Sequence, residues 1–164
     1  MENITTIYLL RHSLKIDNKL IDNANNKEYY QNRREKIVLS VEGEKRAEIL
    51  SQSKELKDID VIFSSNYARA IQTAKYLAER KSLVIHVDER FNERMLGIQQ
   101  ANNYIYIKQY YDENLKNQEG ESRKEVTDRM TEGFWNAVDN YRGKNIAVFT
   151  HGASMTFLLM NWCK

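Results

Sequence analysis

The sequence predicts an α/β fold: a three-layer α/β/α sandwich with a mostly parallel central sheet. Short apolar segments rich in β-branched residues alternate with helical segments along the chain, which is the order typical of a parallel sheet covered on both faces. Of the 164 residues, 41% are hydrophobic, which is sufficient for one buried core. We see no linker and no internal repeat, so we expect a single domain over residues 1–164.

The first strand is expected at residues 4–10, an apolar run that ends abruptly at an Arg-His pair. Residues 15–38 are polar and too many for a simple turn, so we expect a surface excursion with a helical piece near 29–35. The next helix begins after Ser40, because serine is a good N-cap and two glutamates follow in the first turn, where the helix dipole favours negative charge.

The middle of the chain predicts a strand–helix unit and a further strand. Residues 60–63 are short and apolar and are closed by a Ser-Ser pair, which is typical of a buried strand. A helix over 67–80 follows this strand, and together they form a βα unit. Residues 83–87 repeat the strand pattern.

The second half begins with another excursion. Residues 88–120 show no clean period and are rich in Tyr, Asn and Gln. A long helix is predicted over 121–141, where apolar residues recur at helical spacing, and an Arg-Gly pair ends it. The last strand is expected at 145–149, and a final helix runs from 152 to the end of the chain.

Charge and cysteine content limit the classes of partner. Lys and Arg number 25 against 23 Asp and Glu, so the formal net charge is +2, and no electrostatic footprint for nucleic acid is visible. No apolar run is long enough to span a membrane, so we expect neither nucleic acid nor membrane as a partner. The single Cys163 excludes an intrachain disulfide, and no targeting segment is visible, so we expect a cytoplasmic location. The oligomeric state is not predictable.

Basic side chains follow three different strands of the predicted sheet. Arg11 and His12 come after the first strand, Arg69 follows the second, and His151 follows the last. Ligands collect at the carboxyl ends of parallel strands, so these side chains converge on one site. An arginine offers a planar fork of donors to phosphate oxygens, and a neutral imidazole nitrogen can attack phosphorus. The pattern therefore favours phosphoryl chemistry.

A phosphoryl transfer also needs an acid that protonates the leaving oxygen. Glu93 is the candidate for this role, and Glu89 and Glu121 nearby offer the same chemistry. The nucleophilic imidazole must be unprotonated, so we expect the other histidine to be the one that the phosphate keeps cationic.

Four sequence blocks occur in a recognisable order. They are Leu9-Leu10-Arg11-His12, Ser64-Ser65-Asn66-Tyr67-Ala68-Arg69-Ala70-Ile71-Gln72-Thr73-Ala74, Asn92-Glu93-Arg94 with Gly97, and Thr150-His151-Gly152. Together they resemble the histidine phosphatase superfamily, also called phosphoglycerate-mutase-like, and Gly120-Glu121-Ser122 also looks like a segment of it. The resemblance spans residues 4–160, and the second block is its most specific part.

The resemblance implies a phosphoglycerate-mutase-like fold and a covalent mechanism without metal or cofactor. In such a mechanism His12 becomes a phosphohistidine, and Glu93 is first the proton donor and later the base. Arg11, Arg69 and His151 hold the phosphoryl oxygens. The implied partner is a small-molecule phosphate ester.

Asn18 and three departures from the family pattern complete the comparison. Asn18 lies six residues after the nucleophile and matches a family asparagine that contacts phosphate. Ser13 stands where the family usually has glycine, which puts the local backbone geometry in question. Lys15 replaces a small hydroxyl residue common in mutases and changes the charge near the phosphate. Relatives usually continue beyond the position of Lys164, so a C-terminal truncation is left open.

Three functions are carried forward. Metal-independent hydrolysis of phosphate monoesters through His12 is the leading hypothesis. Phosphoglycerate mutase-type transfer is the second, although such mutases are usually longer, with extra chain that closes the site against water. A catalytically silent phospho-ligand binding domain is the third.

Two polar clusters in the excursions have open interpretations. Arg33, Arg34 and Lys36 are either a solvated face or a contact for an acidic substrate. A tyrosine cluster is either a cap packed over the sheet or a pocket wall; its members are Tyr104, Tyr106, Tyr110 and Tyr111.

Overall fold

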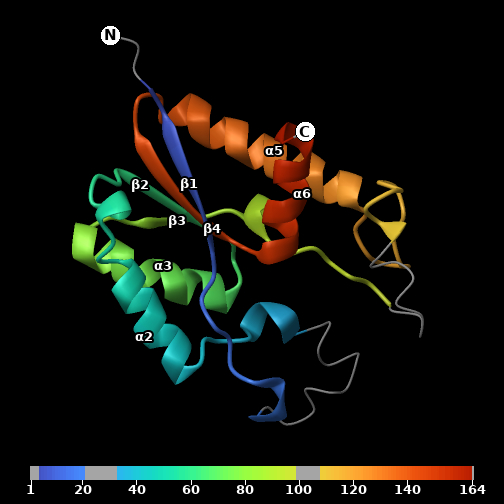
Figure 1. Cartoon of the computed structure of the whole chain (residues 1–164), viewed down its shortest axis with the longest axis horizontal. Helices are drawn as coiled ribbons and strands as arrows, with labels where there is room; N and C mark the ends of the chain where they lie inside the picture. Colours follow the sequence, from blue (N-terminus) through green and yellow to red (C-terminus); the bar gives the residue numbers. More distant parts are fainter. Residues whose placement is uncertain (1–3, 21–32, 99–107, 164) are drawn as a thin grey trace.

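The computed structural model describes residues 4–20, 33–98 and 108–163, and within them it forms the predicted three-layer sandwich (Figure 1). The central sheet has four strands in the order β1-β4-β2-β3, and every neighbouring pair is parallel. The strands are β1 (Thr6–Arg11), β2 (Val61–Ser64), β3 (Ile85–Val87) and β4 (Asn145–Thr150). The predicted fold class is therefore confirmed.

Two pairs of helices cover the two faces of this sheet. Helices α2 (Val41–Leu50) and α3 (Ala68–Lys81) pack together on one face, and α5 (Arg123–Asn140) and α6 (Gly152–Trp162) pack together on the other (Figure 1). The described parts of the connections contain four single-turn 3-10 helices: η1 (Asn18–Leu20), η2 (Arg34–Lys36), η3 (Lys54–Leu56) and η4 (Glu89–Phe91).

The helix starts follow from their capping residues. The Ser40 hydroxyl accepts a hydrogen bond from the Gly43 N–H at 3.0 Å, which confirms the predicted N-cap of α2. The predicted helix over 121–141 begins two residues later, because Ser122 caps α5 and forms a reciprocal capping box with Glu125. The chain leaves α5 through Gly143, whose φ of 76° is left-handed.

Two strand starts lie two residues later than predicted, and the other strand limits differ by one residue at most. The first strand begins at Thr6 instead of residue 4, where it first pairs with β4, and Ile4 is 78% exposed. The third strand begins at Ile85 instead of residue 83, because its only described partner is the short strand β2. The start of each of these two strands is therefore set by where it pairs with its neighbouring strand, and not by the length of its apolar run.

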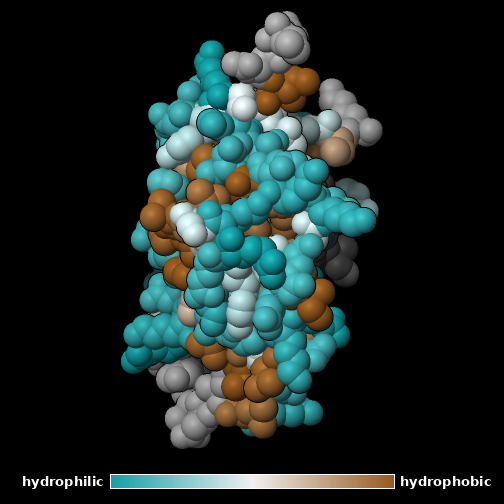
Figure 2. Space-filling model, turned by 90° about the vertical axis from the view of Figure 1, so that its left-hand side faces the viewer, coloured by the Kyte–Doolittle hydropathy of each residue, from teal (hydrophilic) through white to brown (hydrophobic). Residues whose placement is uncertain are grey.

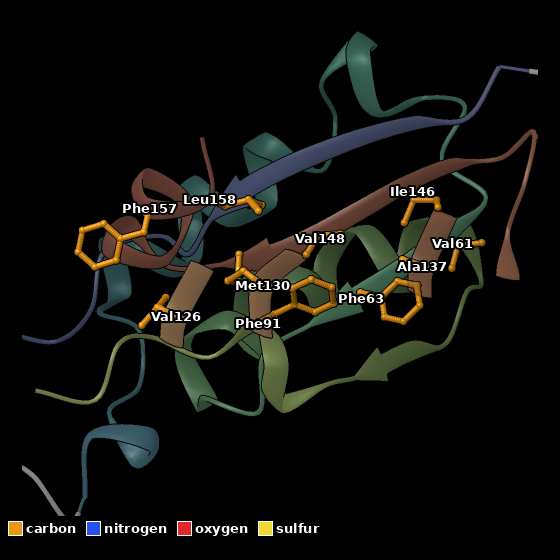
Figure 3. Packing of buried hydrophobic residues seen from close by; sticks show 10 residues of the cluster. All are labelled: Val61, Phe63, Phe91, Val126, Met130, Ala137, Ile146, Val148, Phe157 and Leu158. Carbon is orange, nitrogen blue, oxygen red and sulfur yellow. The ribbon is translucent and has the colours of Figure 1, made fainter. Parts of the chain in front are cut away.

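Side chains alternate between the two faces of the sheet and make two core clusters. Ile146 and Val148 of β4 face α5 and α6, where they meet Val126, Met130 and further apolar residues (Figure 3). Ala147 and Phe149 of the same strand belong to the second cluster, on the side of α2 and α3. β4 is thus buried on both faces, as a central parallel strand requires.

The outer surface is mixed in character. On the face shown in Figure 2, hydrophobic residues form several separate patches among hydrophilic ones. Within the described part of the chain, no helix is long and apolar enough to cross a membrane.

Candidate active site

The sheet register brings the ends of β1 and β4 together. Arg11 pairs with Thr150 in the last rung, and the His12 N–H donates to the Thr150 carbonyl at 3.0 Å. His12 and His151 are therefore the next residues on two adjacent strands, and their ring centroids lie 5.1 Å apart. The predicted convergence of these two histidines is present in the structure.

The hydrogen bond at Nδ1 defines the state of the His12 ring. Nδ1 lies 2.7 Å from the Ser13 carbonyl oxygen, which can only accept, so Nδ1 carries the proton. In the neutral ring, Nε2 then holds the free lone pair. The Ser13 N–H donates to the Thr73 hydroxyl at 3.0 Å, and Ser13 does not have a positive φ. Serine thus fits here in an ordinary backbone conformation.

His151 is fully buried and is held at both ring nitrogens. A guanidinium N–H of Arg69 lies 3.2 Å from Nδ1, and Nε2 lies 2.7 Å from the Ser65 hydroxyl oxygen. Because arginine can only donate, Nδ1 is the acceptor, so in the neutral ring Nε2 carries the proton and donates to Ser65. The ring of Tyr67 meets the imidazole edge-on at 4.9 Å.

Both histidines are held neutral. Burial lowers the pKa of His12 to about 4, assisted by the positive charges of Arg69, Arg11 and Lys15. Burial also lowers the pKa of His151 to about 2, with Arg69 as the next largest cause. A negative phosphate between these groups would offset both effects, since it favours the charged imidazole.

Arg69 lies in the first turn of α3 and is 5% exposed. Besides its contact with His151, its guanidinium donates to the Arg34 carbonyl at 2.8 Å, and its own carbonyl accepts from the Thr73 hydroxyl at 2.7 Å. Arg11 is exposed at the end of β1, and its Nε is 3.4 Å from the position that a Cβ on Gly152 would take. Arg11 therefore lies beside the N-terminus of α6.

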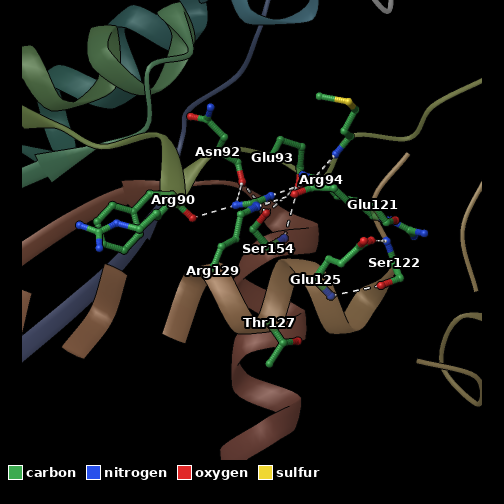
Figure 4. A network of polar contacts seen from close by, with 12 residues as sticks. Arg90, Asn92, Glu93, Arg94, Glu121, Ser122, Glu125, Thr127, Arg129 and Ser154 are labelled. Atoms are coloured by element: carbon green, nitrogen blue, oxygen red, sulfur yellow. Dashed lines mark hydrogen bonds and ion pairs between the residues drawn. The ribbon is translucent and has the colours of Figure 1, made fainter. Parts of the chain in front are cut away.

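Glu93 lies in the loop after η4, against the first turn of α6. Its Oε1 accepts from the Arg94 N–H at 3.0 Å and lies 3.3 Å from both the backbone nitrogen and the hydroxyl of Ser154 (Figure 4). Ser154 also donates to the Asn92 carbonyl, which fixes this loop to α6. Since His151 is the N-cap of the same helix, the carboxylate and the buried histidine belong to one helix end.

The two alternative glutamates have other surroundings. Both carboxylate oxygens of Glu121 pair with Arg129, at 2.7 and 2.9 Å, and one also accepts from the Met95 N–H. The carboxylate of Glu89 is exposed and accepts from the Asn66 side chain. The structure thus places Glu93, rather than these two, against the helix that begins at His151.

Three cavities surround this site, and we name them after one residue each. The His12 cavity, of about 480 Å³, is lined by Arg11, His12, Ser13, Leu14, Lys15, Arg46 and Leu50. The glutamate cavity, of about 290 Å³, is lined by Tyr67, Glu89, Arg90, Asn92, Glu93, Met95, Glu121 and Arg129. The tyrosine cavity, of about 250 Å³, is lined by Arg34, Glu35, Tyr67, Met95, Leu96, Gly97 and Glu119.

Comparison with known families decides what kind of protein this is. The family model described as "Histidine phosphatase superfamily (branch 1)" matches residues 7–164. The chain belongs to this superfamily. No curated protein matches it.

Solved structures of similar fold include several phosphatases. A mycobacterial glucosyl-3-phosphoglycerate phosphatase, in complex with VO3, is 25% identical with a TM-score of 0.72; the match covers 93% of this chain and 79% of that one. YhfR of Bacillus stearothermophilus is 24% identical with a TM-score of 0.73, covering 97% and 80%. A phosphoserine phosphatase mutant from Entamoeba histolytica is 21% identical with a TM-score of 0.72, covering 96% and 79%. The family match and the solved structures of similar fold together support the interpretation of this chain as a phosphatase.

Some predicted residues of this histidine phosphatase are not placed at the site by the structure. The side chain of Asn18 and the residues Tyr104 and Tyr106 lie outside the part of the chain that the structure describes. Of the other clustered tyrosines, Tyr110 packs edge-on against Phe157, and Tyr111 is 88% exposed. Neither is among the residues that line the three cavities.

Other residues join the site although the sequence assigned them no role there. Ser65 and Tyr67 contact His151, and Thr73 connects the nucleophile loop with α3; all three lie within the second sequence block, which was the signal that could have found them. Ser154 has no such signal. Arg34 is half-buried and lines the tyrosine cavity, so a wholly solvated face is wrong for it, whereas Arg33 and Lys36 are exposed.

Metal ligation has no candidate among the residues described. No group of three or more His, Cys, Asp or Glu side chains lies close enough together to hold an ion there.

Proposed function

We propose that this histidine phosphatase hydrolyses phosphate monoesters without a metal, through a phosphohistidine on Nε2 of His12. The observation that carries the proposal is the hydrogen bond from Nδ1 to the Ser13 carbonyl, which directs the lone pair of the neutral ring to Nε2. The lowered pKa of His12 keeps that nitrogen unprotonated across the neutral range. The nucleophile therefore needs no proton transfer before attack.

In the first step, Nε2 of His12 attacks phosphorus, and the bond between phosphorus and the ester oxygen breaks. The Glu93 carboxyl gives its proton to that oxygen, which leaves as an alcohol. In the second step, water attacks the phosphohistidine and passes a proton to Glu93. Inorganic phosphate leaves, and His12 returns to its neutral form. The position of Glu93 against the first turn of α6, where it accepts from the Ser154 N–H, supports this assignment.

The charge of the phosphoryl group has several candidate partners. Arg11 and Arg69 would offer guanidinium donors, and the N-terminus of α6 lies beside them, where a helix dipole favours an anion. His151 is neutral without phosphate, and in the proposal the phosphoryl dianion makes it cationic. These groups stabilise the negative charge on the phosphoryl oxygens, which is largest in the transition state.

The choice of hydrolysis over transfer rests on the relatives. The mycobacterial neighbour is named as a glucosyl-3-phosphoglycerate phosphatase, and the Entamoeba neighbour as a phosphoserine phosphatase. Both names describe loss of phosphate from a small-molecule ester, and we propose a partner of that class. A cytoplasmic location and the phosphate contact of Asn18 stay predictions.

Phosphate release from 4-nitrophenyl phosphate in EDTA tests the proposal, together with acid-labile labelling of the protein by phosphate. We expect release and labelling in the wild type, and loss of both in His12→Ala. His86→Ala is the matched control, because His86 lies in β3, where its ring makes tilted contacts with the rings of Phe63 and Tyr141, and it lines none of the three cavities. Release that survives in His12→Ala would contradict the phosphohistidine. Binding without turnover, unchanged by the substitution, would favour a silent domain.

The role of Glu93 has its own test. Glu93→Gln should reduce turnover of an alkyl phosphate much more than that of 4-nitrophenyl phosphate, because the aryl leaving group needs little protonation. Glu89→Gln is the control, since Glu89 is a nearby exposed carboxylate. Equal losses on both esters would remove Glu93 from the acid role.

A further inference from the structure

The proposed reaction fixes the side of the site on which the alcohol half of the substrate lies. The inference below rests on that proposed function. Attacking nitrogen and leaving oxygen lie roughly in line across phosphorus. The ester oxygen is therefore on the side of Glu93, away from His12, and the alcohol extends into the glutamate cavity. Tyr67 lines both this cavity and the adjoining tyrosine cavity, so it stands where the alcohol would pass.

Tyr67 is built into the site but has an unused hydroxyl. The residue is only 9% exposed, its ring packs edge-on against His151, and the guanidinium carbon of Arg69 lies 4.8 Å from the ring centroid. Among the described residues, the hydrogen bonds of Tyr67 are those of its backbone, with the Ser65 hydroxyl and with the Ala70 and Ile71 N–H groups, and none involves its hydroxyl. A hydrogen bond from a ligand to such a largely buried hydroxyl would stabilise the complex, because it satisfies a polar group that has little contact with water. Burial raises the pKa of Tyr67, so the group stays a donor.

The walls around this hydroxyl carry more negative than positive charge. In the tyrosine cavity Arg34 is the one cation among the described lining residues, against the carboxylates of Glu35 and Glu119. In the glutamate cavity the side chains of Glu89, Glu93 and Glu121 face the two cations Arg90 and Arg129. Arg129 is paired with Glu121, and Arg90 is paired with Asp88 and Glu132. An additional anionic group on the alcohol would meet like charge here, whereas hydroxyl groups could donate to the carboxylates and accept from Tyr67.

The tyrosine cavity is formed by two chain segments that are bonded to each other. The Ile98 N–H donates to the Gln118 carbonyl at 2.9 Å, and the Asn117 side chain donates to the Leu96 carbonyl at 2.7 Å. Gly97, with φ of 66°, lies where a Cβ would come within 2.2 Å of the Gln118 oxygen. The wall that carries Glu119 is thus held against the segment of Met95 and Leu96.

We propose that Tyr67 determines specificity in this enzyme, donating a hydrogen bond to the alcohol half of a phosphate ester that is neutral and carries further hydroxyl groups. Glu35 and Glu119 accept from those hydroxyl groups, and they disfavour esters that carry a carboxylate in the same place. The substrate class is therefore a polyol or sugar phosphate.

Two esters of matched size test the charge preference. Glycerol 3-phosphate and 3-phosphoglycerate differ in one group, a hydroxymethyl against a carboxylate. We expect kcat/KM of the wild type to be at least about tenfold higher for glycerol 3-phosphate, because juxtaposed like charges are costly. Equal values, or a preference for the carboxylated ester, would overturn the inference.

Tyr67→Phe tests the hydroxyl, with Tyr111→Phe as the matched control on an exposed tyrosine. Relative to 4-nitrophenyl phosphate, kcat/KM for glycerol 3-phosphate should fall about three- to tenfold in Tyr67→Phe and stay unchanged in the control. Because this variant keeps the ring, equal losses on both esters would show that the hydroxyl supports the site in general and does not contact the alcohol, and no loss on either ester would show that only the ring matters; either result would overturn the inference. Should Tyr67→Phe fail to fold, Glu119→Gln decides: it should raise the rate for 3-phosphoglycerate relative to glycerol 3-phosphate, and an unchanged ratio would count against the proposal.

The result with 4-nitrophenyl phosphate distinguishes failure of the specificity inference from failure of the proposed function. Release of 4-nitrophenol by the wild type that depends on His12, without the expected polyol preference, overturns only the specificity inference. A wild type that releases phosphate from none of the three esters overturns the proposed function and this inference with it.

Discussion

Mild acid should destabilise this protein more than its carboxyl groups alone would, because the half-buried His12 and the buried His151 resist protonation in the folded state. The folded pKa values are about 4 for His12 and about 2 for His151, against about 6.5 in an unfolded chain. Between about pH 6.5 and pH 4 the unfolded chain therefore binds more protons than the folded protein. The free energy of unfolding is highest above this window and falls as the pH decreases through it.

The magnitude follows from the linkage relation. Integrated from pH 6 to pH 5, each histidine lowers the free energy of unfolding by about 1.2 kcal/mol, so His12 and His151 together account for about 2.4 kcal/mol. Carboxyl groups in an unfolded chain titrate near pH 4, so this interval reports mainly on the histidines.

Urea unfolding followed by circular dichroism at pH 6 and pH 5 measures this loss. His151→Gln is the informative variant, because glutamine can accept from Arg69 and donate to Ser65 without titrating. We expect its loss over the interval to be about 1.2 kcal/mol smaller than that of the wild type. An equal loss in both proteins would refute the reasoning that His151 is a buried neutral imidazole.

Three further substitutions have defined expectations. Arg69→Ala should lower kcat/KM by about 10²- to 10³-fold, the scale for one fixed electrostatic donor, and a loss below about tenfold in steady-state kinetics would remove Arg69 from the site. Thr73→Val should lower the free energy of unfolding by about 1–3 kcal/mol in urea, because the Ser13 N–H loses its acceptor. Thr73→Ser keeps a hydroxyl and should retain most of the stability. Similar free energies for both variants would argue against this hydrogen bond. Gly97→Ala should cost more than about 1 kcal/mol, because both its φ and the nearby Gln118 oxygen oppose a Cβ, and wild-type stability would contradict the described turn.

Local sequence patterns predicted which elements form but not where all of them begin. The helix after Ser40 and the strand at 145–149 are found nearly as predicted, because a capping residue and an unbroken apolar run are local signals. The strand predicted at 83–87 is shorter, and Val84 is 72% exposed. A strand limit depends on its neighbour, which a single segment does not encode.

The same division applies to the site. His12, Arg69 and His151 could be predicted because each follows a strand and carries chemistry that packing does not need. The proton position on His12 could not, since it depends on the Ser13 carbonyl in the folded loop. Arg34 could be named as a possible substrate contact, but its bond to Arg69 could not be predicted, because its backbone carbonyl and not its side chain accepts from Arg69.

The strand order β1-β4-β2-β3 has a consequence for how the protein is made. β4, which follows the other three described strands in the sequence, lies between β1 and β2, so these two have no contact in the described sheet until β4 is inserted between them. Contacts of such high sequence separation form slowly, and open strand edges invite aggregation in the meantime. His151 directly follows β4, so it takes its place beside His12 only when β4 joins the sheet. A ribosome-bound chain lacking β4 would thus have neither a complete sheet nor two histidines side by side, and enzyme activity on the nascent chain would report directly on this final insertion.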